Sequence, residues 1–270
     1  MTFGQRLQAA IAARGRFCAG IDPHAELLGR WGLTDDPEGL RRFALTATEA
    51  LAAVVSVVKP QSAFFERHGS RGIAVLEEVI SLAHEQGALV LLDVKRGDIG
   101  STAQAYADAY LDPRSPLAAD AITASPYLGI GSLDPMVDTA LDHDKGVFIL
   151  ALTSNKEAPQ VQHARTRDGG TVAGEVLAAI AARNAGHTGL GSVGAVVGAT
   201  IGDSDEDFDI NGPILAPGVG AQGGTAADVR RIFGTAAPNV ISSSSRELLT
   251  AGPDPQALAD AARKAVAAFV

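Results

Sequence analysis

The sequence predicts a single-domain α/β protein, a (β/α)8 barrel of the TIM type that spans residues 1–270. Two observations predict this fold class. Short runs rich in Val, Ile and Leu recur eight times, and a helical pattern follows each run. Continuously apolar strands that alternate with amphipathic helices form a parallel sheet covered by helices. A doubly wound open sheet would produce the same alternation, so the number of units and the chain length favour the barrel without excluding that alternative.

The expected elements alternate evenly along the chain. Residues 1–15 have the pattern of an amphipathic helix that precedes the first strand. Each expected strand is a short apolar run that ends in polar, Gly or Pro residues, and each expected helix has apolar positions three or four apart. The strands are expected at 17–22, 54–61, 88–95, 121–127, 146–154, 193–200, 214–220 and 239–245. The helices are expected at 37–52, 69–86, 100–111, 131–143, 171–186, 224–234 and 255–268.

Two segments interrupt this even spacing. The long polar segment 156–170 is expected to be an insertion in a loop between a strand and its helix. The acidic segment 202–209 is expected to form a short solvated helix. Neither segment resembles a linker between domains, so the sequence predicts one domain.

Composition limits the class of partner. A formal net charge of −9 argues against a general nucleic-acid or anionic-membrane binder. Cys18 is the only cysteine, so no intramolecular disulfide can form, which suits a reducing cytosol. Residues 1–15 lack the continuous apolar region of a signal peptide, and the apolar runs 88–92 and 147–152 are too short to cross a bilayer. We therefore expect a soluble, cytoplasmic protein with no nucleic-acid or membrane partner.

Polar side chains gather at the ends of the expected strands. In a barrel, the functional residues sit at the carboxyl ends of the strands, where all the strand-to-helix loops meet. An acidic protein that binds an anion must do so with a few placed cations or amides, so cations at these ends are informative. The residues at these ends are Asp22, Lys59, Asp93, Lys95, Asp98, Ser154, Gln222 and Arg246.

Asp93 and Lys95 lie two positions apart on one expected strand, so their side chains point to the same face. Their neighbours Leu92 and Val94 are apolar, which predicts that the shared face is the barrel interior. Burying an acid and a lysine together is costly unless they pair. One interpretation is a structural ion pair that fixes the barrel. Lys59 at the preceding strand end weakens it, because a third charge joins the same edge.

Asp98 has two interpretations from the sequence alone. It precedes the helix expected to begin near Ile99, and acids stabilise helix N-termini. A helix cap is therefore as good an explanation of this residue as a role in a site. Both interpretations remain open at this stage.

The segment APGVGAQGG, residues 216–224, contains glycines spaced as G-x-G-x-x-G. A dinucleotide-binding motif would lie early in the chain and have an acid about 20 residues further on. Here a serine run follows instead, so we reject that interpretation. The loops after the seventh and eighth strands of a barrel commonly bind phosphate, and Gln222 and Arg246 would supply donors. The alternative is a tight glycine-rich turn beside a surface arginine.

No metal or organic cofactor is expected. The histidines show no metal-ligand spacing, and the chain has no Walker motif or cysteine cluster. The chemistry should therefore depend on the charges of the protein itself.

With these residues in place, the chain resembles orotidine 5′-phosphate decarboxylase, in the longer bacterial subgroup of that family. The specific part is D-x-K-x-x-D in DVKRGDIGST, combined with a lysine at the second strand and the PGVGAQGG loop. The match also includes Asp22, VKPQ with Lys59, LTSN with Ser154, and SSR with Arg246. In place of the family's usual glycine before the phosphate-binding arginine, this chain has Ser245, which leaves the detailed phosphate geometry open.

The resemblance implies a homodimeric enzyme that removes CO2 from orotidine 5′-monophosphate to give UMP without a metal or organic cofactor. It implies a charge network of Lys59, Asp93, Lys95 and Asp98. Lys95 would protonate pyrimidine carbon 6, and Asp93 would lie beside the departing carboxylate. Asp98 would cross the dimer interface.

The same resemblance implies the substrate contacts. Asp22 and Lys59 would bind ribose hydroxyls, and Asp98 and Thr102 would reach the ribose in the neighbouring subunit's site. Ser154 would contact the base, and Gln222 and Arg246 the phosphate. Ile99 and Pro217 complete the implied set of substrate-binding residues.

Two alternatives belong to other classes of protein. A related sugar-phosphate decarboxylase or aldolase-like barrel would use a divalent metal, but Lys59 stands where such relatives are expected to carry an acid. A non-catalytic nucleotide-binding barrel would keep the glycine loop, yet it would not need Lys95 between two acids.

Overall fold

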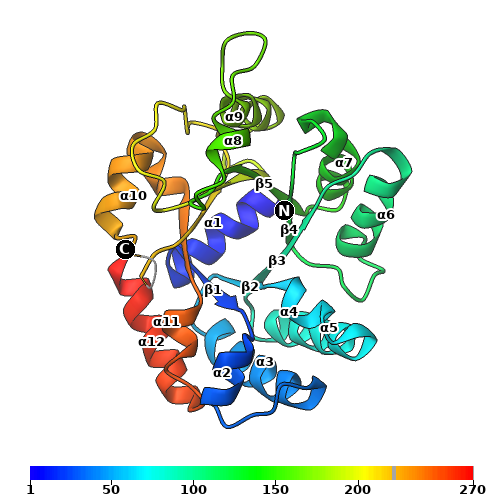
Figure 1. Cartoon of the computed structure of the whole chain (residues 1–270), viewed down its shortest axis with the longest axis vertical. Helices are drawn as coiled ribbons and strands as arrows, with labels where there is room; N and C mark the ends of the chain where they lie inside the picture. The colour runs from blue at the N-terminus through cyan, green and yellow to red at the C-terminus, as the bar shows by residue number, and fades with distance from the viewer. Residues whose placement is uncertain (221–222, 270) are drawn as a thin grey trace.

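Eight parallel strands form a closed barrel in a computed structural model that describes residues 1–220 and 223–269 (Figure 1). Each strand pairs with the next along the chain, and the last pairs with the first. The predicted (β/α)8 barrel is therefore confirmed, and the doubly wound open sheet is excluded because this sheet has no edge. The strands are β1 Phe17–Ile21, β2 Val57–Pro60, β3 Leu89–Arg96, β4 Ala121–Ala124, β5 Gly146–Leu152, β6 Val193–Val197, β7 Ile214–Pro217 and β8 Val240–Ser244.

Helices surround the barrel (Figure 1). Several begin at caps that the sequence supplies: Asp36 accepts a hydrogen bond from the Gly39 amide, and Thr225 forms a capping box with Asp228. The α-helices are α1 Phe3–Arg14, α2 Ala25–Arg30, α3 Pro37–Ala52, α4 Ser62–Glu66, α5 Gly69–Glu85, α6 Gly100–Leu111, α7 Asp134–Asp142, α8 Pro159–Gln162, α9 Val172–Arg183, α10 Ala226–Phe233, α11 Arg246–Leu249 and α12 Pro255–Ala268. Short 3-10 turns cover Ile130–Leu133 and Gly234–Asn239.

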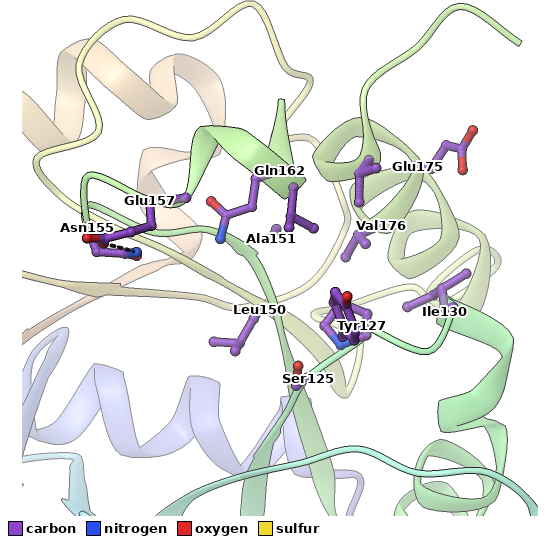
Figure 2. A pocket seen from close by; sticks show the side chains of 15 residues that line it. Ser125, Tyr127, Ile130, Leu150, Ala151, Asn155, Glu157, Gln162, Glu175 and Val176 are labelled. Atoms are coloured by element: carbon purple, nitrogen blue, oxygen red, sulfur yellow. Dashed lines mark hydrogen bonds between the residues drawn. The ribbon is translucent and has the colours of Figure 1, made fainter. Parts of the chain in front are cut away.

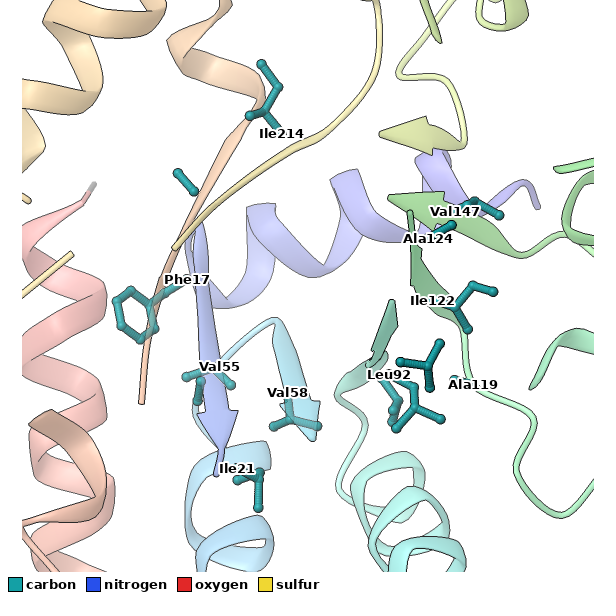
Figure 3. Packing of buried hydrophobic residues seen from close by; sticks show 14 of the residues in the cluster. Phe17, Ile21, Val55, Val58, Leu92, Ala119, Ile122, Ala124, Val147 and Ile214 are labelled. Carbon is teal, nitrogen blue, oxygen red and sulfur yellow. The ribbon is translucent and has the colours of Figure 1, made fainter. Parts of the chain in front are cut away.

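The strands separate two apolar layers. Alternate residues of a strand point to opposite faces, so Leu92 packs outward under the helices while Leu91 fills the barrel interior. Figure 3 shows part of the outer layer, which includes Phe17, Val58, Leu92 and Ile122. The same alternation puts the odd-numbered positions of β3 inside, which decides where its charged residues point.

Helix α1 closes the amino-terminal end of the barrel, and Figure 1 shows it across the middle of the ring. Phe3 and Leu7 belong to the interior apolar cluster, and the Phe3 ring meets Phe148 edge-on with centroids 6.0 Å apart. Gly146 makes this possible, because a Cβ there would lie 2.5 Å from the Phe3 ring. One end of the barrel is thus filled with apolar side chains, which leaves the carboxyl end for a site.

The two segments that interrupt the even spacing, 156–170 and 202–209, differ in how they compare with the sequence expectation. Residues 156–170 lie between β5 and α9 and contain α8, followed by an antiparallel bridge between Arg165 and Thr171. The helix expected at 202–209 is wrong: the segment is irregular. Local bonds compete with a helix there, since the Asp207 carboxylate accepts from the Asp209 amide at 2.9 Å. None of the helices that the structure describes is long and apolar enough to cross a membrane.

Candidate active site

A buried charged cluster lies inside the carboxyl end of the barrel, at the ends of β2 and β3. The Lys59 Nζ lies 2.9 Å from Asp93 Oδ2, and the Lys95 Nζ lies 2.6 Å from Asp93 Oδ1. Asp93 and Lys95 share the interior face because they are two residues apart on β3. The structure therefore brings together three of the charges that the sequence singled out.

Two uncharged residues complete the environment of Asp93. Thr123 on β4 donates from Oγ1 to Asp93 Oδ1 at 2.8 Å, and Gln61 donates from Nε2 to Oδ2 at 3.1 Å. Sequence reasoning did not assign either residue to the site. The available signal was strand parity: Gln61 follows Lys59 by two positions.

The cluster is ionised at neutral pH. Burial alone would lower the pKa of Lys59, but the charges of Asp93 and Asp22 outweigh burial and raise that pKa. Burial alone would raise the pKa of Asp93, but Lys59 and Lys95 hold it well below its usual range. The carboxylate therefore stays negative between two ammonium groups.

Lys95 differs from Lys59 in both exposure and backbone. Its side chain is 45% exposed, whereas that of Lys59 is 8% exposed. Its φ angle is +45°, in the left-handed region that non-glycine residues rarely adopt. Its amide donates to Thr123 Oγ1 at 2.9 Å. Lys95 thus offers an accessible ammonium on a strained residue near the end of β3, and such strain clusters at functional sites.

A small hollow of about 130 Å³ lies beside this cluster, between the ends of β1, β7 and β8. Asp22 Oδ1 is buried there without a hydrogen-bond partner among the described residues, 3.9 Å from the Lys59 Nζ. A buried acceptor without a partner is costly unless a ligand or water satisfies it. The residues that line the hollow are Asp22, His24, Lys59, Pro217, Gly218, Val219, Ser243, Ser244, Ser245 and Arg246.

The glycine loop after β7 closes on itself beside this hollow. Gly218 and Gly220 have φ angles of +101° and +71°, and a Cβ on Gly220 would lie 1.6 Å from a Glu247 carboxylate oxygen. The positive φ angles favour glycine at both positions, whereas the flexible Glu247 side chain can move aside. Gln222, expected to bind phosphate, lies outside the described residues. Ser245 has a φ of −127°, so the position where the family usually has glycine does not need glycine's freedom in this chain.

Asp98, Ile99 and Thr102 follow β3 but do not join the cluster of their own chain. Asp98 Oδ1 accepts a hydrogen bond from the Ile99 amide at 2.8 Å and forms no ion pair among the described residues. The N-cap of α6 is Ile99, without a side-chain cap. The Asp98 carboxylate therefore does not cap α6 in the usual way, and the helix-cap interpretation loses support. Ile99 is 62% exposed.

A second, larger hollow of about 520 Å³ lies between the ends of β4 and β5 and helices α8 and α9 (Figure 2). Its walls are mainly apolar, and its charged members are Glu157 and Glu175. Ser154 follows the end of β5 by two residues, and its neighbour Asn155 lines this hollow. The preceding Thr153 binds Gln162 of α8 through both its amide and its hydroxyl, each at 2.8 Å. These two bonds attach α8 to the end of β5.

The barrel and its interior cluster define a class of protein: a (β/α)8-barrel enzyme whose site combines an accessible ammonium, a buried carboxylate and a glycine loop suited to phosphate. A family model described as the orotidine 5′-phosphate decarboxylase / HUMPS family matches residues 15–262. This chain belongs to that family.

Individual relatives agree with the family match over nearly the whole chain. An orotidine 5′-phosphate decarboxylase of Nocardioides sp. is 67% identical over 261 residues, which cover 96% of this chain and 95% of that protein. A solved Streptomyces avermitilis structure described as the same enzyme has a TM-score of 0.97 and 56% identity, and the match covers 99% of this chain and 94% of that one. The Leishmania donovani OMP decarboxylase has a TM-score of 0.73 and 31% identity, covering 100% and 98%.

Proposed function

We propose that this chain decarboxylates orotidine 5′-monophosphate to UMP in pyrimidine synthesis, as a single barrel domain in the cytoplasm. The family match and the 67% identity to a decarboxylase support the reaction. The observation that carries the mechanism is the accessible Lys95 ammonium 2.6 Å from the buried Asp93 carboxylate. Charges of this kind need no metal or organic cofactor.

Lys95 acts as the proton donor in this proposal. The bond between carbon 6 and the carboxyl carbon breaks, CO2 leaves, and the electron pair remains on carbon 6. That vinylic carbanion has no adjacent carbonyl to delocalise it, so a fixed ammonium beside it stabilises the developing charge. The Lys95 Nζ then gives its proton to carbon 6, which yields UMP and a neutral lysine that solvent reprotonates.

Asp93 has two tasks in the same step. Its Oδ1 accepts a hydrogen bond from the Lys95 ammonium at 2.6 Å and so holds that group in place before the reaction. It also lies where the substrate's carboxylate would approach Lys95, so the two negative charges repel in the ground state, and that repulsion ends when CO2 leaves. The buried Lys59 counters the charge of Asp93 without competing for carbon 6.

The small hollow is the better place for the phosphate and ribose. Arg246 lies at its edge, and the unpartnered Asp22 Oδ1 beside Lys59 can accept from a ribose hydroxyl. Pro217 is the last residue of β7, and Gln222 belongs to the segment after it that would enclose the phosphate. The larger hollow carries two acids and apolar walls, which suit an anion poorly. Ser154, two residues after β5, would contact the base.

A homodimer completes the site in this proposal, with Asp98, Ile99 and Thr102 reaching the partner's ligand. Asp98 has no cationic partner in its own chain among the described residues, and Ile99 is widely exposed. The apolar side chains of Tyr127 and Leu128, on the loop after β4, and of Val161, in α8, are also exposed at the same end of the barrel. Exposed apolar side chains gathered at one end suit an interface.

The metal-dependent alternative is less well supported. The Lys59 ammonium lies at hydrogen-bonding distance from Asp93 Oδ2, so a cation already occupies the position that a metal would need. A non-catalytic barrel would not require the strained backbone conformation of Lys95. Neither alternative explains the cluster as a whole.

The test is the fall in orotidine 5′-monophosphate absorbance when the protein is added, with and without a chelator. We expect turnover that is insensitive to chelation. No turnover would refute the enzyme proposal, and turnover lost with chelator and restored by magnesium would favour the metal-dependent alternative.

The dimer has its own test. Asp98→Asn and Lys95→Ala chains, each inactive alone, are mixed under conditions that exchange subunits. One site of each mixed dimer would then hold an intact Lys95 and an intact Asp98, so about a quarter of full activity should return in a statistical mixture. A mixture that exchanges subunits but stays inactive would refute a shared site.

A further inference from the structure

Thr123 links the side chain of Asp93 to the backbone of Lys95. It lies on β4, faces the barrel interior and is 1% exposed. Its Oγ1 donates to Asp93 Oδ1 at 2.8 Å and accepts from the Lys95 amide at 2.9 Å. One hydroxyl therefore contacts both residues on which the proposed chemistry depends.

The direction of these bonds is fixed by the ionisation of Asp93. Because its neighbouring lysines hold the pKa of Asp93 well below its usual range, the carboxylate has no proton to donate. The single hydroxyl proton of Thr123 must go to Asp93, and a lone pair is then free for the Lys95 amide. Replacing the hydroxyl with a methyl group would break both bonds at once.

The Lys95 amide belongs to the irregular end of β3, where the φ angle of Lys95 is +45°. A non-glycine residue in this region costs of order 1 kcal/mol or more and persists only where its surroundings hold it there. The regular pairing of β3 with β4 is shifted between Leu92 and Arg96, so regular pairing between these strands does not hold Lys95 in this conformation. A β-branched threonine has few rotamers, which makes its hydroxyl a rigid anchor.

We propose that Thr123 is a positioning residue for the decarboxylation: it holds the backbone of Lys95 and orients Asp93 so that the ammonium is already aimed when substrate binds. It acts through these two residues and does not itself touch the substrate. The inference rests on the proposed role of Lys95 as proton donor.

Two substitutions separate the hydroxyl from the shape of the side chain. Thr123→Val keeps the volume and removes the hydroxyl, and Thr123→Ser keeps the hydroxyl. We expect kcat to fall about 10- to 100-fold in Thr123→Val, since hydrogen bonds to charged groups are of that strength. KM for the substrate and the affinity for UMP should change less than about 3-fold, because binding contacts remain. Thr123→Ser should keep kcat within about 3-fold of the parent.

Ser56→Ala is the matched control for a purely structural role. Ser56 is also buried, and its hydroxyl donates to the Phe17 carbonyl at 3.0 Å, between the starts of β2 and β1. Its removal should lower the melting temperature as Thr123→Val does, but leave kcat unchanged. A crystal structure of Thr123→Val should show Lys95 out of the left-handed region.

Failure of the positioning role of Thr123 can be distinguished from failure of the proposed function. No turnover by the parent protein would refute the function itself. An active parent, an inactive Lys95→Ala variant and a Thr123→Val variant with kcat within 2-fold of the parent would refute the positioning role alone. Equal loss in Thr123→Ser and Thr123→Val would also refute it, since the hydroxyl would then not be the determinant.

Discussion

Two buried carboxylates stand at opposite ends of the barrel, and their surroundings differ. Asp93 lies at the carboxyl end, and Asp120 precedes β4 at the amino end. Both are nearly inaccessible, at 6% and 4% exposure. Asp120 accepts from Arg6 at 2.5 Å, from the Val90 amide at 2.9 Å, and lies 2.8 Å from His84 Nε2. Asp93 instead has two lysines, one of which is open to solvent.

This difference shows that a buried ion pair does not by itself mark an active site. Burial would raise the pKa of Asp120, but His84 and Arg6 hold it well below its usual range, just as the lysines do for Asp93. Around Asp120 the donors are used up: Arg6 also donates to the Asp144 carbonyl at 2.9 Å. Around Asp93 an accessible ammonium and an unpartnered Asp22 oxygen remain available to a ligand. The two clusters therefore differ in whether polar groups remain free to bind a ligand.

The largest effect is expected from Lys95→Ala, which removes the accessible ammonium. kcat should fall at least about 100-fold, because general acid catalysis contributes that much or more. The fold should persist, since this side chain is only half buried. Turnover of orotidine 5′-monophosphate measures the loss, with the melting temperature as control. Turnover within 10-fold of the parent would contradict the role of Lys95 as proton donor.

Asp93→Asn should produce the next largest loss. The amide cannot hold the Lys95 ammonium in place electrostatically, and removing a placed charge or donor from such a site typically costs about 100-fold or more in kcat. It also leaves the buried Lys59 without its nearest counter-charge, so the free energy of unfolding should fall as well. Turnover and urea unfolding measure the two effects. A stable variant with full turnover would contradict both.

Asp120→Asn is the matched change at the other end of the barrel. It should lower the free energy of unfolding by about 1–3 kcal/mol, because the partly exposed Arg6 and His84 lose the buried carboxylate that they bind. kcat for the folded fraction should stay within about 2-fold, since the site lies at the opposite end. Urea unfolding and turnover per folded molecule test this contrast. A large loss of kcat without loss of stability would erase the distinction between the clusters.

Acid unfolding sharpens the same contrast. The folded-state pKa of Asp120 is below the ordinary value of 3.8, so its contribution to stability is complete above that value. The contribution is lost as pH falls from about 4 toward the depressed pKa, because the unfolded chain takes up the proton first. In this range the stability of Asp120→Asn should depend on pH less steeply than that of the parent, by up to about 1.4 kcal/mol per pH unit. Equal slopes would indicate that Asp120 is not ionised in the folded protein.

Part of this arrangement could be predicted from the sequence. Eight apolar runs with intervening helical patterns were enough for the barrel, and the period of two along β3 was enough to put Asp93 and Lys95 on one face. Strand parity puts Gln61 on the same face as Lys59, but the register between strands decides which uncharged side chain meets Asp93. The contacts of Thr123 and Gln61 with Asp93 therefore could not be predicted. The positive φ angle of Lys95 has no sequence signal, because lysine rarely adopts it. Asp120 was overlooked because its partners come from α1 and α5, far apart in the chain.

The smallest effect is expected from Ser245→Gly, which tests whether every unpartnered oxygen at the carboxyl end serves the ligand. Ser245 Oγ is buried without a partner among the described residues, and it faces Gly20, where a Cβ would lie 2.7 Å from the Ser245 Cβ. With a φ of −127°, the position gains nothing from glycine, so the added freedom of the unfolded chain should lower stability by about 0.5–1 kcal/mol. Ser245 lines the hollow proposed for the phosphate, but the neighbouring Arg246 supplies the charge that would bind the anion, so KM should change less than about 2-fold. A 10-fold rise in KM would instead indicate that Ser245 binds the phosphate. The groups at this end that bind the ligand would then include Ser245 as well as Asp22 and Lys95.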